Sequence, residues 1–212
     1  MVCSKMGKDE VIDVKIIAAT ANKGKAAEIE KIFSALGFEV VTMREAGIDS
    51  DPEENGKTFL ENALIKARAA HELAENAYII ADDSGLCVDA LGGAPGIYSA
   101  RYAGDGATDA EKIEKLLREL DGVETRAAHF ETAVALITPD GEEITAHGKV
   151  HGHILTEPEG DNGFGYDPVF YCDEIGKTFA IASNDEKNAV SHRGRALHAL
   201  YEKMKNKVGE DE

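Results

Sequence analysis

A strand, a turn and a helix follow one another in residues 14–37, which read VKIIAATANKGKAAEIEKIFSALG. The continuous apolar run at residues 14–19 is typical of a buried strand, and the turn behind it is polar. From Ala26 to Leu36 the apolar side chains recur at helical spacing, and Gly37 is the expected end of that helix. A strand that leads directly into a helix is the repeating unit of α/β folds, so this stretch sets the fold class.

The same alternation continues along the rest of the chain. Further strands are predicted at residues 40–43, 78–81, 129–138 and 142–154. Further helices are predicted at residues 58–76, from residue 108 onward, and at about 194–207; the first two open with the capping-box pairs Thr58/Glu61 and Thr108/Glu111. A turn at residues 139–142 joins the last two strands into a hairpin. Helices interleaved with strands, plus one hairpin, predict an α/β fold with a mixed sheet.

The chain has 212 residues, of which 43% are hydrophobic, which is enough for the core of one domain. We expect a single domain at residues 14–207, an N-terminal extension at residues 1–13 and an acidic tail at residues 208–212. No apolar run approaches the ~18 residues of a membrane helix, and no secretory signal is visible. The cysteines fit reduced cytoplasmic thiols better than a disulfide framework or a zinc site: Cys3, Cys87 and Cys172. These features predict a cytoplasmic protein without a membrane partner.

The charge balance is strongly acidic, with 40 Asp and Glu against 23 Lys and Arg, a net charge of −17. Such a surface repels the phosphate backbone of nucleic acids, and the sequence has no basic stripe that would offset this repulsion. We therefore expect no nucleic-acid partner. A small phosphate ligand is still compatible with this charge, because a few nearby lysines and a metal ion dominate at contact distance.

The polar turn before the first helix is suited to bind an anion. A helix N-terminus presents unpaired N–H groups and a partial positive charge. Gly24 lets the backbone approach closely, Lys23 and Lys25 add charge, and Thr20 and Asn22 add neutral hydrogen bonds. The alternative is an ordinary turn with exposed lysines, and neither the P-loop nor the dinucleotide glycine pattern is present.

Two carboxylate-rich stretches offer oxygen ligands. Glu53 and Glu54 lie in a loop before a helix, and Asp82-Asp83-Ser84-Gly85 is expected directly after a strand, at the edge where α/β sheets usually bind ligands. Oxygen-only clusters suit Mg²⁺, and one such Asp is a candidate to deprotonate an attacking water. The alternative is a solvated turn.

The helix after Thr58 carries Asn62 and Lys66 four residues apart, so they share one face. That face is a candidate to turn toward Glu54 and Asp83, with Lys66 meeting a phosphate. The alternative is a solvated helix face.

Two motifs near the C-terminus are suited to hold a base. Gly163-Phe164-Gly165-Tyr166-Asp167-Pro168 is a tight aromatic turn that can stack a base and accept hydrogen bonds from its edge. Lys187 precedes Ser191-His192-Arg193-Gly194, whose His and Arg donors suit a carbonyl-bearing ring edge or an anion. The alternatives are a rigid glycine-rich corner and a solvated His-Arg pair.

His147, His151 and His153 share one face of a predicted strand. We interpret them as an exposed polar face rather than a metal site, because such a face is much the commoner origin of this spacing.

The order of these motifs along the chain is specific, and it resembles the inosine triphosphate pyrophosphatase family from about Val14 to Lys205. The motifs that carry the resemblance are Thr20-x-Asn22-x-x-Lys25, Glu53-Glu54, Thr58-Phe59-x-Glu61-Asn62-Ala63-x-x-Lys66-Ala67, Ala81 to Leu86, Leu91 to Arg101, Gly163 to Pro168, and Ser191 to Gly194.

The resemblance implies a Mg²⁺-dependent enzyme that hydrolyses non-standard purine nucleoside triphosphates (ITP, dITP and XTP) to the monophosphate and pyrophosphate, which keeps these bases out of DNA and RNA. It also implies a homodimer, and two lobes around a nucleotide cleft on an elongated mixed sheet. Carried onto this sequence, it implies that Glu54 and Asp83 hold the metal and that Asp83 also accepts the proton.

The resemblance further implies the substrate contacts. Phosphates would be held by Thr20, Ala21, Asn22, Lys23, Gly24, Lys25, Lys66 and Lys187, with Ser84 also touching substrate. The base would be held by Phe164, Gly165, Tyr166 and Asp167, and its 6-oxo edge by His192 and Arg193. Two alternatives stay open: a pyrophosphatase for modified pyrimidine triphosphates, and a nucleotide-binding sensor without catalysis.

Overall fold

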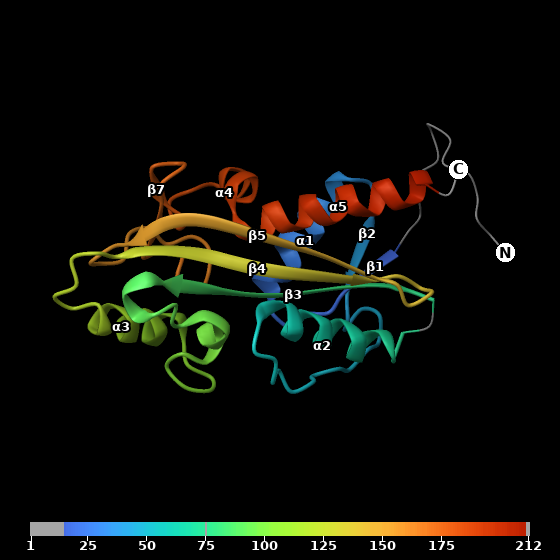
Figure 1. Cartoon of the computed structure of the whole chain (residues 1–212), viewed down its shortest axis with the longest axis horizontal. Coiled ribbons are helices and arrows are strands. Elements are labelled where there is room, and N and C mark those ends of the chain that lie inside the picture. Colours follow the sequence, from blue (N-terminus) through green and yellow to red (C-terminus); the bar gives the residue numbers. More distant parts are fainter. Residues whose placement is uncertain (1–14, 75, 211–212) are drawn as a thin grey trace.

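The computed structural model describes residues 15–74 and 76–210, and within them the strands form one seven-stranded sheet (Figure 1). Its spatial order is β2-β1-β3-β4-β5-β6-β7. The strands are β1 (Lys15–Ala18), β2 (Glu39–Thr42), β3 (Tyr78–Val88), β4 (Ala127–Ile137), β5 (Glu143–Ile154), β6 (Phe170–Cys172) and β7 (Lys177–Thr178). β1 is parallel to β2 and β3, and the remaining pairs are antiparallel, so the predicted mixed sheet is confirmed.

Helices cover both faces of this sheet. They are α1 (Lys23–Ala35), α2 (Phe59–His71), α3 (Asp109–Glu119), α4 (Asn184–Val190) and α5 (His192–Glu210), with short 3₁₀ helices η1 (Asp89–Leu91) and η2 (Gly96–Arg101). Among the described residues, none of the helices combines the length and the apolar character that crossing a membrane requires.

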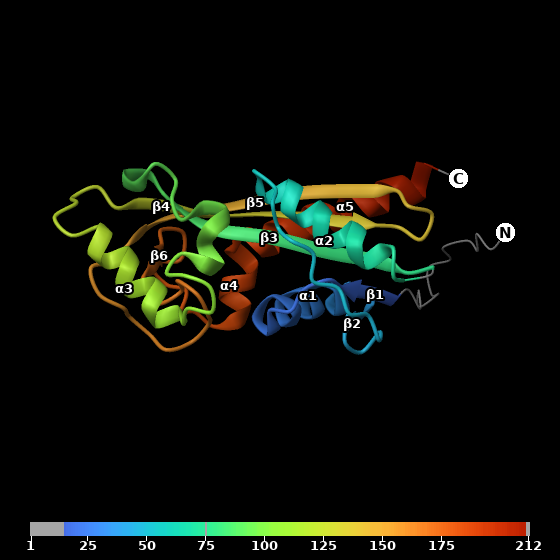
Figure 2. The same ribbon diagram turned by 90° about the horizontal axis from the view of Figure 1, so that it is seen from below.

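The long strands β3, β4 and β5 run along the longest dimension of the molecule and connect its two ends (Figure 1). One end carries β1, β2 and α2, and the other carries α3 and β6 (Figure 2). Side chains alternate between the two faces of a strand. The face that bears Ile80 packs against α1 and α5, whereas the face that bears Ile79 packs against the alanines of α2.

The strand predicted at residues 78–81 was too short, because β3 continues to Val88. Asp82, Asp83 and Ser84 therefore lie inside the sheet, paired with β4, and not in a solvated turn. A run of polar residues looks like a turn in sequence, but here distant cationic side chains pair with the buried carboxylates, so strand pairing continues through them.

Other boundaries also differ from the predictions. α2 ends at His71, and α5 runs from His192 to Glu210, so it includes most of the predicted acidic tail. At Thr58 only half of the predicted capping box forms, because the Glu61 carboxylate accepts from the backbone N–H of Lys57 instead of that of Thr58. The box at Thr108 is complete. The predicted N-terminal extension lies outside the described residues.

Candidate active site

A cavity of about 350 Å³ lies where β1 stops and β3 continues. Its size is within the range of small-ligand sites, roughly 300–1,000 Å³. β1 pairs with β3 only as far as Ala18 and Ile80, so side chains from both faces of β3 reach the open edge beyond. Most of the site residues predicted from the sequence line this cavity: Thr20, Ala21, Asn22, Lys25, Glu54, Lys66, Asp83, Ser84, Phe164, Gly165, Tyr166, Asp167, His192 and Arg193. Lys23, Gly24 and Lys187 are not among the lining residues.

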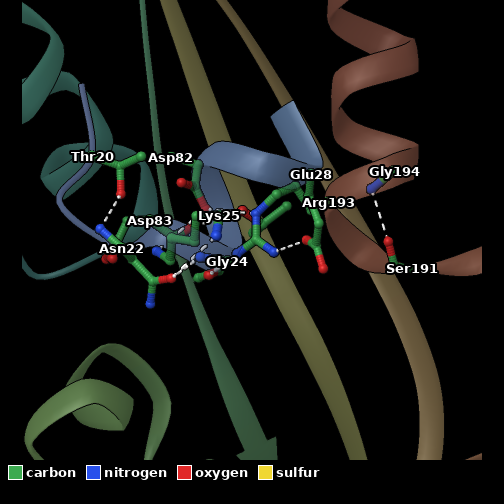
Figure 3. Close-up of polar contacts among 12 residues, drawn as sticks. Thr20, Asn22, Gly24, Lys25, Glu28, Asp82, Asp83, Ser191, Arg193 and Gly194 are labelled. Atoms are coloured by element: carbon green, nitrogen blue, oxygen red, sulfur yellow. Dashed lines mark hydrogen bonds and ion pairs between the residues drawn. The ribbon is translucent and has the colours of Figure 1, made fainter. Parts of the chain in front are cut away.

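The turn before α1 is held by its own polar side chains (Figure 3). The side chain of Asn22 caps the helix by accepting from the backbone N–H groups of Gly24 and Lys25, at 2.9 and 3.1 Å. Asn22 N–H in turn donates to the Thr20 hydroxyl at 3.2 Å. A Cβ at Gly24 would lie 2.6 Å from the Phe164 ring, so glycine lets this turn pack against the aromatic turn. Lys23 is exposed.

Glu54 and Asp83 converge on one lysine. The Lys66 ammonium lies 3.3 Å from Glu54 Oε2 and 3.4 Å from Asp83 Oδ1. Burial raises the pKa of Asp83, although the neighbouring Lys66 and Lys25 oppose that shift. Burial lowers the pKa of Lys66, but the Asp83 carboxylate and its acidic neighbours outweigh it, and the net shift is upward. The predicted convergence of the two acidic stretches is present.

The α2 helix also fixes Asp83 through an amide. Asn62 donates from Nδ2 to Asp83 Oδ2 at 3.1 Å, and its carbonyl oxygen accepts from the backbone N–H of Gly56 at 2.8 Å. The other Asp83 oxygen faces Lys66. Asn62 therefore ties the carboxylate to the loop that carries Glu54.

On the opposite face of β3, Asp82 is completely buried among cations. Its Oδ2 lies 3.3 Å from the Lys25 ammonium and accepts from Arg193 Nε at 3.1 Å. Burial alone would raise the pKa of Asp82, but Lys25 and Arg193 hold it well below the ordinary value. Burial lowers the pKa of Lys25, against the attraction of Asp82.

Arg193 donates to a protein group from each of its three nitrogens. Besides Asp82, it donates to the carboxylate of Glu28 (Figure 3). It also donates to the hydroxyl of Ser84 at 2.8 Å. Glu28 was not predicted as a site residue. The sequence does hold one indication of its role. Glu28 lies three positions after Lys25 and next to the apolar stripe of α1, so its side chain is placed on the same side of the helix as Lys25. Arg193 thus connects α1, β3 and α5 at the wall of the cavity.

The aromatic turn is anchored by Asp167. Its Oδ2 accepts from Phe164 N–H at 2.9 Å and from the Lys187 ammonium at 2.7 Å. Lys187 also lies 3.0 Å from Glu28 Oε1, and its ammonium is 4.5 Å from the centre of the Phe164 ring. Lys187 is therefore buried behind the aromatic turn, where its ammonium is held by Asp167 and Glu28 rather than by the turn before α1.

Tyr166 and Gly165 attach the same turn to the far end of the molecule. The buried Tyr166 donates its hydroxyl proton to the carbonyl of Ser99 at 3.0 Å. Gly165 N–H donates to Asp109, the first residue of α3, at 2.7 Å. Asp109 lines the cavity and was not predicted as a site residue.

His192 lines the cavity as a neutral ring. It is 5% exposed and stacks on Phe130, with ring centres 4.8 Å apart and planes 13° from parallel. Burial, together with Arg193 and Lys187, holds its pKa well below the ordinary value. Within the described part of the chain, its Nδ1 has no hydrogen-bond partner. A buried polar atom without a partner is suited to meet a ligand.

Comparisons with known proteins agree with this arrangement. The model of the Ham1 family matches residues 16–203. A protein of Caldanaerobacter subterraneus subsp. tengcongensis named dITP/XTP pyrophosphatase is 49% identical over 201 residues, which cover 93% of this chain and 100% of that relative. A Clostridium perfringens protein of the same name is 48% identical over 198 residues, 90% of this chain and 97% of the relative.

The fold agrees as well. The solved structure of the Staphylococcus aureus Ham1 protein matches with a TM-score of 0.80 at 42% identity, covering 91% of this chain and 99% of that one. Sequence and fold therefore match over nearly the whole length, and this chain belongs to the Ham1 family.

Proposed function

We propose that this chain hydrolyses the non-standard purine nucleoside triphosphates ITP, dITP and XTP to the monophosphate and pyrophosphate. The observation that carries the proposal is the meeting of Glu54 and Asp83 at Lys66, in a cavity lined also by the turn before α1 and by the aromatic turn. The relatives named dITP/XTP pyrophosphatase support the same activity.

The carboxylates fit a magnesium ion. Glu54 and Asp83 offer only oxygen atoms, the donors that Mg²⁺ prefers, and both already lie within 3.4 Å of one cation, the Lys66 ammonium. We propose that these two residues hold Mg²⁺. When bound there, the ion would supply charge neutralisation to the phosphates.

The chain's own residues would perform the remaining steps. The N–H groups at the start of α1, with Lys25 and Lys66, bind and orient the triphosphate. Asp83, held by Asn62, accepts a proton from the attacking water. The water oxygen bonds to the α-phosphorus while the bond to the bridging oxygen breaks, and pyrophosphate leaves.

Base selection would depend on His192. A neutral imidazole whose Nδ1 carries the proton can donate to the 6-oxo oxygen of inosine or xanthine, whereas the 6-amino group of adenine offers only donors there. An unpaired buried polar group costs about 1–3 kcal/mol, which corresponds to roughly tenfold to hundredfold discrimination. Arg193, with protein partners at all three nitrogens, would orient Ser84 and the neighbouring His192 at this edge.

A panel of nucleoside triphosphates with Mg²⁺ tests this function. Monophosphate and pyrophosphate should form from ITP, dITP and XTP, and at least about tenfold more slowly from ATP. Faster release from methylated UTP would assign the site to modified pyrimidines instead. Absence of monophosphate from every substrate would favour the alternative of a nucleotide-binding sensor without catalysis. Release of orthophosphate in place of pyrophosphate would refute cleavage between the α- and β-phosphates.

The homodimer and the cytoplasmic location stay predictions that come from the family resemblance and the sequence composition. Light scattering of the purified chain would give twice the mass of 22.7 kDa for a dimer. A mass equal to one chain at micromolar concentration would contradict it.

A further inference from the structure

A group of metal-binding side chains lies on the sheet away from the carboxylates of the active site. Cys87 of β3 is directly opposite His129 of β4, and Glu131 is two residues further along the same face of β4. Among residues 15–74 and 76–210, this is the one group of three Cys, His, Asp or Glu side chains whose ligand atoms all lie within 4.8 Å of one another. We call it the Cys87 cluster (Cys87, His129 and Glu131).

The spacing of the Cys87 cluster is close to that of a tetrahedral site. Zinc bonds of roughly 2.0–2.3 Å place neighbouring ligand atoms about 3.3–3.8 Å apart. His129 Nε2 and Glu131 Oε2 are already 3.7 Å apart, and every pair is within 4.8 Å. Shifts of about 1 Å in side chains that are partly exposed would complete the geometry. His129 and Glu131 retain 21% and 22% exposure, so the ion has a route from solvent.

We propose that the Cys87 cluster binds a thiophilic divalent cation of the Zn²⁺ type. Its donors are one sulfur, one nitrogen and one oxygen, a set that Mg²⁺ avoids and that zinc or cobalt accepts. His151 is directly opposite His129 on β5, with ring centres 5.5 Å apart, and is suited to supply a fourth ligand. Cys87 is four residues beyond Asp83 in β3, a separation of about 13 Å, so the two metal sites are distinct.

Two features of the cluster set the conditions for binding. The thiol is 8% exposed, and burial raises its pKa to about 11, so coordination releases one proton from Cys87 to solvent. The Lys149 ammonium lies 2.9 Å from Glu131 Oε2 and competes with the ion for that carboxylate. Removing the Lys149 charge should therefore tighten metal binding.

The ion would brace the loop that forms one wall of the active-site cavity. Cys87 forms a backbone bridge to Pro95, and η2 begins at the next residue. Ile97 and Ser99 of η2 line the cavity. A cation that joins β3 to β4 beside this loop binds only the folded chain and so raises its unfolding temperature.

Cobalt titration of the full-length chain tests the site, in a Cys3→Ser background and with excess Mg²⁺. A cobalt–thiolate charge-transfer band in the near ultraviolet should appear with one equivalent of Co²⁺, and Zn²⁺ should abolish it. The band requires a thiolate ligand, so an oxygen-only site at Glu54 and Asp83 cannot produce it. Cys87→Ser should remove the band, and the matched control Cys172→Ser, which changes the other described buried cysteine, should keep it.

Further variants keep the test decisive if Cys87→Ser does not fold. His129→Ala and Glu131→Gln should each weaken Co²⁺ binding at least about tenfold while the thiol stays in place. Lys149→Met should tighten it about two- to fivefold, the change expected from removing an exposed ion pair. Failure of the parent chain to give the band, or a band that is unchanged in His129→Ala and Glu131→Gln, would refute the site. ITP hydrolysis with Mg²⁺ should continue in His129→Ala, Glu131→Gln and Lys149→Met, which separates this proposal from the proposed function.

Discussion

The two sides of β3 hold two neighbouring aspartates in different environments. Asp83 faces α2, where it shares Lys66 with a second carboxylate, Glu54. Asp82 faces α1 and α5, where two cations, Lys25 and Arg193, contact the same oxygen. The pKa of Asp83 is raised by burial, whereas that of Asp82 is held low because its cations outweigh burial.

This difference suits Asp83 to a catalytic role and Asp82 to a structural one. Asp83 is 7% exposed and lines the cavity, as the proposed proton acceptor must, whereas Asp82 is fully buried and stays charged. A pair of carboxylates whose pKa values are shifted in opposite directions is a common arrangement in sites that need one proton acceptor and one permanent charge. We expect activity to depend on the α2 side and stability on the α5 side.

The largest effect should come from Asp83→Asn. The amide keeps the size of the side chain but cannot accept the proton, so kcat for pyrophosphate release should fall about 10²- to 10⁴-fold. The unfolding midpoint in denaturant should stay close to that of the parent. The matched control is Glu53→Gln, at an exposed carboxylate next to Glu54, which should leave kcat unchanged. Near-normal turnover by Asp83→Asn would remove Asp83 from the mechanism.

Asp82→Ala should act on stability. It leaves Lys25 and Arg193 buried without their shared carboxylate, so the free energy of unfolding should fall by about 3–5 kcal/mol. Denaturant titration measures this change. Asp185→Ala removes an exposed ion pair with Lys31 and should cost no more than about 1 kcal/mol. Equal stability of the two variants would mean that Asp82 is not a structural anchor.

A smaller effect is expected on base selection. His192→Ala removes the unpaired imidazole nitrogen, and the ratio of kcat/KM for ITP to that for ATP should fall about tenfold to hundredfold. Arg193→Ala should narrow the same ratio. Because it also removes one of the two cations that pair with Asp82 and with Glu28, Arg193→Lys serves as the milder variant. If the ratio does not change in any of these variants, neither residue contributes to base recognition.

Local signals in the sequence were sufficient for much of the fold. The apolar stripe of α1, the capping box at Thr108 and the turn between β4 and β5 involve neighbours in the chain, and their elements were predicted to within a few residues. Most residues that line the cavity were also predicted, because the order of the motifs resembles that of a known family. The short β6 and β7 were missed, since two- and three-residue strands carry almost no pattern of their own. α4 was also missed, although its capping box Ser183/Glu186 is a local signal.

The errors occur where distant residues decide the structure. Asp82 and Asp83 were placed just beyond the end of their strand, because their partners Arg193 and Lys66 belong to distant helices and the sequence does not show that they pair. Lys187 pairs with Asp167 behind the aromatic turn, and its expected role at the phosphates stays a prediction. Cys87 was interpreted as an isolated thiol. Its cluster forms through strand pairing between β3 and β4, which residue spacing does not reveal.

The smallest predicted effect concerns pH and again involves the α5 side. His192 is surrounded by Arg193, Lys187 and Lys25, which with burial lower its pKa, and Asp82 opposes them only in part. The folded chain therefore keeps this ring neutral at pH values where an unfolded His, with a pKa near 6.5, takes up a proton. Because the unfolded state binds the proton first, stability falls as the pH drops below about 6.5, by up to about 1.4 kcal/mol for each whole step in pH.

Denaturant titrations of the parent and of His192→Gln between pH 7.5 and 5 would isolate this contribution, since glutamine keeps polar character but does not titrate in that range. The difference in unfolding free energy between the two proteins should shrink steadily as the pH falls, because only the parent loses stability through this ring. A constant difference would mean that His192 titrates alike in both states. In that case burial on the α5 side would not fix the charge of the ring, and the contrast between the two sides of β3 would hold for the aspartates alone.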